Sequence, residues 1–261
     1  MVGSLVQKLG RWTIDHGLFY SEAAEILREA ASSALRFDFI NRAVFTVLIR
    51  QIYFTSVQAI PVIFTSALIL GSITVNYLLS ILTGFGAYNQ VGNFLLGTML
   101  HEIAPVITII ILLLRSGTAV ISEIALMKIN GEIDALRLMD VSIPQYIFLP
   151  RILAFLIAGP SLAIFFSVTG LIGSFFILGY VHDITFDNYL DQLFYAIEIR
   201  DVAIVVLKPA LMAVAVAGIS IQNGMCVRRA FTEVPVMLIR GMMQSVIVIA
   251  LIEAIFTFAK L

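Results

Sequence analysis

The stretch Leu100–Arg151, LHEIAPVITIIILLLRSGTAVISEIALMKINGEIDALRLMDVSIPQYIFLPR, decides how the chain is organised. It opens in an apolar run that contains His101 and Glu102, and it returns to an apolar run through Pro144. Between the two runs, residues 115–140 form the longest polar interruption after residue 50. This pattern predicts a span that descends through a membrane, a charged segment at the membrane surface, and a second span that climbs back.

A short helix is expected inside this polar segment. Ile129, Ile133 and Leu136 recur at helical spacing, and Asn130-Gly131 is a turn signal near its start. Two interpretations remain open on these residues alone: a connecting loop, or a docking helix for a soluble partner.

The amino-acid composition is that of an integral membrane protein. Hydrophobic residues make up 60% of the 261 residues and charged residues 13%, with a mean hydropathy of +1.02. Soluble domains carry roughly 25% charged residues. The net charge of −1 gives no attraction for nucleic acid, and the single cysteine, Cys226, excludes an intrachain disulfide. We expect N-terminal amphipathic helices in residues 1–50, followed by one transmembrane domain over residues 51–261.

Hydropathy predicts an all-α fold with five transmembrane helices. No Asp, Glu, Lys or Arg occurs from residue 51 to residue 100, a run far longer than the roughly 20 residues of one span. Gly, Asn and Gln cluster at 84–92 and divide that run in two. The expected spans are 56–82, 91–115, 150–179, 202–223 and 236–259. Before them, Leu5, Leu9 and Trp12 share one helical face, which indicates a helix lying in the membrane interface.

The distribution of basic residues predicts the orientation. Lys and Arg gather before the first span, between spans two and three, and between spans four and five, whereas the other side has Arg200 and Lys260. Because positive loops stay in the cytoplasm, we expect a cytoplasmic N-terminus and a periplasmic C-terminus. The 116–150 segment would then be a cytoplasmic helix-containing loop.

Three charged residues are expected inside the spans. Counting about 1.5 Å per residue from the cytoplasmic ends places Glu102, Lys208 and Glu253 in one layer, roughly 20 Å from that edge. Bare charges at that depth cost at least about 2.5–3.5 kcal/mol each. Either a structural ion pair or a polar lining along which lipid headgroups pass would explain them. Pro105 and Pro209 predict helix breaks beside this layer.

Several kinds of chemistry find no support in the sequence. The histidines His16, His101 and His182 have no partners at metal-ligand spacing, so no metal site is expected. Neither a phosphate-binding P-loop nor a G-x-S-x-G nucleophile motif occurs. We therefore expect no catalytic residues in this chain.

Two blocks of the opening stretch carry a family resemblance. HEIAP at 101–105, followed by SGTAVISEIALMKINGEIDALRLMDVSIPQYIFLPRILA at 116–154, resembles the signature region of the MlaE permease family. Members of that family run close to RELGP and then GSA.AAELG.M...EQIDAL..MG.DP..YL..PR.LA. Departures include His101 for the usual Arg, Gly131 for Thr and Asp140 for Gly.

The resemblance implies the membrane subunit of an ABC transporter for phospholipid or a related lipid in the bacterial inner membrane. Members of the family work as homodimers, receive lipid-binding MCE-domain proteins on the periplasmic face, and dock a cytoplasmic ATPase that binds ATP and Mg. For this chain it implies a coupling helix for the ATPase and a set of lipid-path candidates. The coupling residues would be Glu132, Ile133, Asp134, Leu136 and Met139. The lipid-path candidates would be His101, Glu102, Lys208 and Glu253.

Two other functions compete with this one. A proton-coupled secondary transporter could use Glu102 and Glu253, although an odd number of spans and the lack of a detectable inverted repeat speak against it. An intramembrane enzyme built on His101 and Glu102 lacks an accompanying nucleophile or metal set.

Overall fold

The structure, a computed structural model, describes residues 21–33, 42–85, 91–182, 189, 193–195, 199–228 and 230–259. Nearly all of these residues are helical, and none of them lies in a strand. Five segments are long and apolar enough to cross a membrane: Arg42–Leu82, Phe94–Ile129, Pro144–Gly173, Arg200–Cys226 and Glu233–Ala259. The predicted all-α membrane fold with five spans is therefore confirmed.

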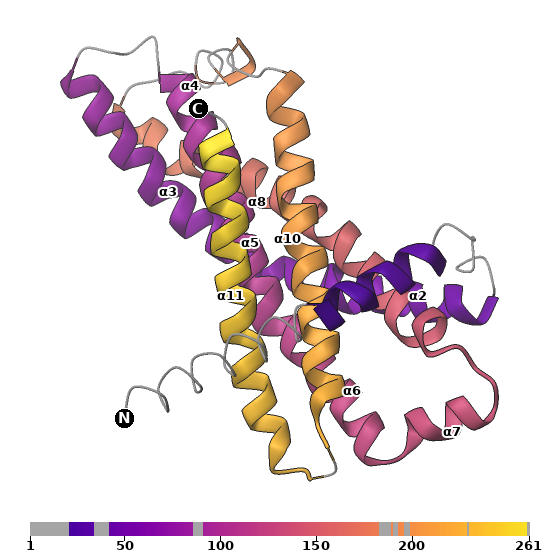
Figure 1. Cartoon of the computed structure of the whole chain (residues 1–261). Coiled ribbons are helices and arrows are strands. Elements are labelled where there is room, and N and C mark those ends of the chain that lie inside the picture. The colour runs from indigo at the N-terminus through magenta and orange to yellow at the C-terminus, as the bar shows by residue number, and fades with distance from the viewer. Residues whose placement is uncertain are drawn as a thin grey trace, which may run out of the picture.

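Two long helices form the centre of the bundle. α8 (Leu149–His182) packs against α3 (Ile60–Gly84) and α10 (Ile199–Cys226), and α10 packs in turn against α11 (Glu233–Ala259). Figure 1 shows α10 and α11 running along the long axis, with α4 (Val91–Leu96) and the last turns of α11 at the same end of the molecule. Most apolar side chains of α11 are exposed in the single chain.

Two helices lie across this axis. The helix at residues 21–33 lies on α10, where Gln222 donates a hydrogen bond to Glu22. α2 (Arg42–Thr55) packs on α8 and connects to α3 through the short turn η2 (Val57–Ala59). Figure 1 shows both as indigo helices that cross the long ones. The predicted face at Leu5, Leu9 and Trp12 lies outside the described residues.

The second span is longer than predicted. After α4, the π-helical segment η4 (Gly97–Ile103), α5 (Ala104–Leu112), the π-helical segment η5 (Leu113–Gly117) and α6 (Thr118–Ile129) follow without interruption. The helix continues past the predicted span end near residue 115 because α6 buries Val120, Ile121 and Ile124 in the bundle. This apolar stripe carries the helix past Arg115, well beyond the length that a membrane requires.

A turn then separates α6 from the short helix predicted in the opening stretch. Gly131 has a φ of 75°, a conformation that a glycine adopts without steric cost. α7 (Glu132–Leu138) starts directly after it, so Ile129 ends α6 and does not share α7 with Ile133 and Leu136. The chain returns through the π-helical segment η6 (Pro144–Phe148) to α8. Figure 1 places α7 at one end of the molecule, called the α7 end below.

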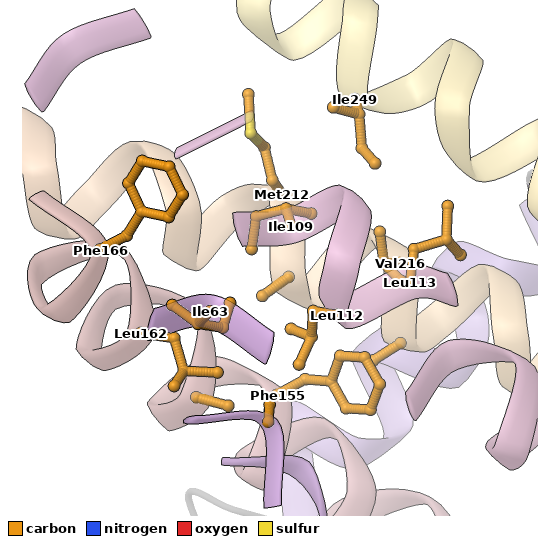
Figure 2. Close-up of a cluster of buried hydrophobic side chains, with 14 of the residues drawn as sticks. Ile63, Ile109, Leu112, Leu113, Phe155, Leu162, Phe166, Met212, Val216 and Ile249 are labelled. Atoms are coloured by element: carbon orange, nitrogen blue, oxygen red, sulfur yellow. The ribbon is translucent and has the colours of Figure 1, made fainter. Parts of the chain in front are cut away.

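The core is a continuous apolar cluster shared by the long helices. Phe155 and Phe166 of α8 are the largest fully buried apolar side chains. They face side chains from α3, α5 and α10, among them Ile63, Ile109 and Met212 (Figure 2). Because lipid tails are as apolar as these side chains, close packing and not the hydrophobic effect stabilises such contacts inside a membrane.

Glycines permit two of the closest helix contacts. A Cβ at Gly71 of α3 would lie 2.6 Å from the Cα of Gly170 in α8. A Cβ at Gly159 of α8 would lie 2.8 Å from the carbonyl oxygen of Pro209 in α10. The second contact lies where Pro209 predicted a helix break at Lys208. That prediction is wrong, since α10 passes through Lys208 and Pro209 as a helix. Packing against α8 holds the helix together there. Pro105 is the second residue of α5, and the helix is irregular just before it, in the π-helical segment η4.

Replacing Gly71 with Ala should destabilise the protein, because the new methyl group would collide with backbone and force α3 away from α8. Overpacking of this kind costs about 1–3 kcal/mol. We expect a lower midpoint in thermal unfolding of the detergent-solubilised protein. Gly84→Ala, at the end of the same helix with no atom within 4 Å of its added Cβ, is the matched control. Equal midpoints for the two variants would contradict the close contact between α3 and α8 at Gly71 and Gly170.

Candidate functional site: a buried charge cluster

A lysine surrounded by acceptors lies at the contact of three helical segments. Lys208 Nζ lies 2.6 Å from Oε1 of Glu253 in α11 and 3.5 Å from Oε2 of Glu102 in η4. It also donates a hydrogen bond to the carbonyl oxygen of His101. Thr257, one turn beyond Glu253, donates to the same Glu102 oxygen at 3.5 Å. The structure thus brings together the three charges that depth counting placed in one layer.

Local sequence explains how these groups reach one another. Gly97–Ile103 is π-helical, so its residues turn by less than those of an α-helix, and the following Pro105 cannot donate a backbone hydrogen bond. The carbonyl oxygen of His101 is available to Lys208 at this irregular point. Such π-helical segments are frequent at functional sites.

The three charged side chains differ in their access to the surroundings. The Lys208 side chain is 1% exposed, that of Glu253 is 21% exposed and that of Glu102 is 40% exposed. Glu102 lines an open cavity of about 320 Å³ together with Phe94, Gly97 and Thr98. One ammonium faces two carboxylates, so with all three ionised the cluster has a formal charge of −1. A cationic group or water that enters the cavity can approach this charge through Glu102.

The side chain of His101, the fourth lipid-path candidate, contacts the start of a different helix. Its ring is buried and Nε2 lies 3.0 Å from Oδ1 of Asp201, near the start of α10. The ring therefore links η4 to α10, and it does not line the cavity beside Glu102.

Sequence reasoning missed Asp201 and Thr257. Asp201 precedes Lys208 by seven residues, and Thr257 follows Glu253 by four, so each lies on the same helical face as its charged neighbour. This spacing was a usable signal. The expected fourth span begins at residue 202, so it leaves Asp201 outside the membrane.

The helix predicted to couple to an ATPase, α7, packs one side against the core of the bundle. Ile133 is 2% exposed and packs into the core cluster, with Leu136 partly buried against it. Leu138 is 90% exposed, and Met139, which follows the helix, is largely exposed as well. Glu132 and Asp134 occupy the first turn of α7, where their negative charges are stabilised by the positive end of the helix dipole. The exposed apolar surface at the end of α7 is therefore formed by Leu138 and Met139 and not by Ile133.

Comparison with known proteins identifies the type of membrane protein. A family model described as Permease MlaE matches residues 48–259, which is most of the chain. The chain belongs to this permease family. The predicted resemblance is confirmed, and it extends well beyond the two blocks at 101–105 and 116–154. Membership in a family of ABC transporter permeases also speaks against the proton-coupled secondary transporter.

Relatives come from bacteria and from a plant. The intermembrane phospholipid transport system permease protein MlaE of Haemophilus influenzae is 28% identical over 173 residues, which cover 66% of this chain and 65% of the relative. A probable ABC transporter permease protein of Rickettsia typhi is 25% identical over 179 residues, 69% of each chain. The chloroplastic protein TRIGALACTOSYLDIACYLGLYCEROL 1 of Arabidopsis thaliana is 25% identical over 142 residues, 54% of this chain and 41% of the relative.

The geometry of the charge cluster predicts strong energetic coupling between Lys208 and Glu253. Lys208→Met should lower stability by about 3–5 kcal/mol, because it leaves two neighbouring carboxylates with no ammonium between them. Adding Glu253→Gln should recover part of this loss, with a coupling energy of about 0.5–3 kcal/mol. The measurement is the fraction of protein that stays monodisperse in size-exclusion chromatography after heating. Losses that simply add in the double variant would contradict the pairing.

Proposed function

We propose that this chain is the permease subunit of an inner-membrane ABC transporter that moves phospholipid between the membrane and an MCE-domain protein. The observation that carries the proposal is the charge cluster, in which buried Lys208 holds two carboxylates and one of them, Glu102, opens into a cavity. The printed function of the Haemophilus relative, intermembrane phospholipid transport, supports the choice of substrate class.

The division of the cluster into buried and exposed members favours two separate roles. Lys208 has almost no exposure and three protein partners, so it would fix η4, α10 and α11 relative to one another. Glu102 faces the cavity, where Phe94 supplies an apolar wall. A carboxylate beside an apolar wall suits the ammonium group and the adjoining apolar part of a zwitterionic phospholipid. Glu102 would then be the residue that contacts the headgroup.

The proposed assembly uses faces that the single chain leaves exposed. Apolar side chains recur along the outer face of α11, and pairing of two copies there would make the homodimer. The exposed residues of this face are Val236, Ile239, Met243, Val246, Ile247, Leu251, Ile255 and Phe258. The cavity at Glu102, which α11 flanks through Thr257, would then open towards the second copy.

The α7 end would face the cytoplasm, and the C-terminus the periplasm, as the positive-inside rule predicts. On the cytoplasmic side, α7 would dock an ABC ATPase, which binds ATP and Mg. On the opposite side, Tyr195 is 92% exposed and Phe194 is exposed beside it, which offers aromatic contacts to a periplasmic MCE-domain protein.

Transport tests the role of Glu102. Glu102→Gln should reduce ATP-dependent phospholipid transfer from liposomes carrying the whole complex about tenfold or more, because an amide offers no charge to the headgroup. Assembly, followed by size-exclusion chromatography, should stay normal, since Glu253 remains the nearer partner of Lys208. Glu25→Gln, an exposed acid on the N-terminal helix, is the control. Wild-type transfer by an assembled Glu102→Gln complex would refute a headgroup contact at this site.

Co-purification tests the docking helix. Leu138→Asp should release the ATPase in mild detergent, because it introduces a charge at the most exposed apolar side chain of α7 without disturbing buried Ile133. Phe231→Asp, which places the same charge on an exposed side chain between α10 and α11, should retain the ATPase. The assignment of α7 fails if both variants retain it equally.

A further inference from the structure

A second cavity, of about 460 Å³, lies between α2 and the segment where η5 passes into α6. It is separate from the charge cluster, since Arg115 follows Glu102 by thirteen residues, or about 20 Å along the helix. Seven of its ten lining residues are polar, and its charged members are Arg50, Arg115 and Glu123. The polar neutral members are Gln51, Thr55, Gln58 and Ser116.

The cavity carries a net positive charge. Glu123 is neutralised by Arg151, whose Nη2 lies 2.8 Å from Oε2 of the glutamate, and Arg151 itself is buried. Arg50 and Arg115 remain as two cations in the lining. The cavity therefore favours an anion, in contrast to the acidic cavity at Glu102.

One of the two arginines is held in a fixed position. Arg115 donates from Nη1 to the carbonyl oxygen of Phe54 at 2.5 Å and from Nη2 to Oε1 of Gln58 at 2.7 Å. Both acceptors lie where α2 ends and η2 begins. A guanidinium has five N–H donors, so these two bonds leave others for a ligand. Arg50 projects from α2, and its exposed side chain can adjust to what enters the cavity.

Sequence depth counting would place the cavity near the lipid headgroups. Arg115 directly follows the uncharged apolar run of the second span at residues 104–114, and residues of α2 line the same cavity. Phe45, Ile49 and Phe54 of α2 are exposed apolar side chains, which suits contact with acyl chains. Tyr53 of α2 is exposed as well, and tyrosine is enriched where a membrane meets water.

We propose that this cavity binds the phosphate group of an anionic phospholipid from the leaflet at the α7 end. Arg50 and Arg115 contact the phosphate, Gln51 and Thr55 supply further polar contacts, and the acyl chains lie along the exposed apolar side chains of α2. Arginine forks suit phosphate oxygens, and the hydrogen bonds are charge-assisted. This site goes beyond the proposed transport path, and it would tie α2 to the second span through the lipid.

Binding of a short-chain lipid to the purified full-length protein in mild detergent tests the proposal. Dioctanoyl phosphatidylglycerol should bind and raise the thermal unfolding midpoint, whereas dioctanoylglycerol, which lacks the phosphate, should not. Arg50→Gln should weaken the binding about tenfold, the effect of losing one charge-assisted contact. Arg42→Gln, which removes an exposed arginine of the same helix that does not line the cavity, should leave the binding unchanged. Equal binding by the two variants would overturn the proposal.

Further measurements distinguish a lipid ligand from free phosphate and from a protein contact. Inorganic phosphate that binds as tightly as the lipid would overturn a lipid ligand in favour of free phosphate. Loss of ATPase co-purification in Arg50→Gln, with lipid binding intact, would instead make the cavity a protein contact. Glu102→Gln should leave phosphatidylglycerol binding unchanged, so failure of the transport proposal does not affect this test. A photoreactive phosphatidylglycerol in nanodiscs should crosslink to peptides within residues 42–58 or 113–123, and crosslinks confined to other segments would overturn the assignment.

Discussion

A lysine ammonium inside a membrane must be compensated by neighbouring groups, and much of this structure follows from that constraint. Lys208 is almost completely buried, so water cannot solvate it, and its partners come from two other segments, η4 and α11. Each partner also fixes a helix: Glu253 fixes α11, and Glu102 with the His101 carbonyl fixes η4. Without the ammonium, two carboxylates would repel each other at a depth where charge is costly. The cluster therefore determines how the second, fourth and fifth spans meet.

The sequence predicted this meeting because depth in a membrane is a simple function of residue number. A helix rises by a constant amount per residue, so counting from the basic ends located all three charges in one layer. Hydropathy likewise gave five spans, since a bilayer imposes one minimum length on every helix that crosses it. These are properties of single segments, and they need no knowledge of neighbouring helices.

What the sequence did not predict depends on packing between segments. The side-chain exposure of Glu102 relative to Lys208 follows from where α11 and η4 lie, which no periodicity encodes. The pairing of His101 with Asp201 requires α10 to begin before the residue at which hydropathy rises. The helix at Pro209 persists because α8 supports it through Gly159. The burial of Ile133 in α7 has the same origin, since half of a short amphipathic helix must face its support.

The two cavities place opposite charges at two depths along one continuous helical segment. Glu102 in η4 offers a carboxylate, and Arg115 in η5 offers a guanidinium, so both charges sit in π-helical segments separated by α5. A phospholipid headgroup carries a phosphate and, when zwitterionic, an ammonium. Because the two sites lie about 20 Å apart along the helix, one headgroup cannot occupy both, and each site would take a different lipid molecule. Movements of α7, which continues from α6 through one glycine turn, would reach both sites through the same helix.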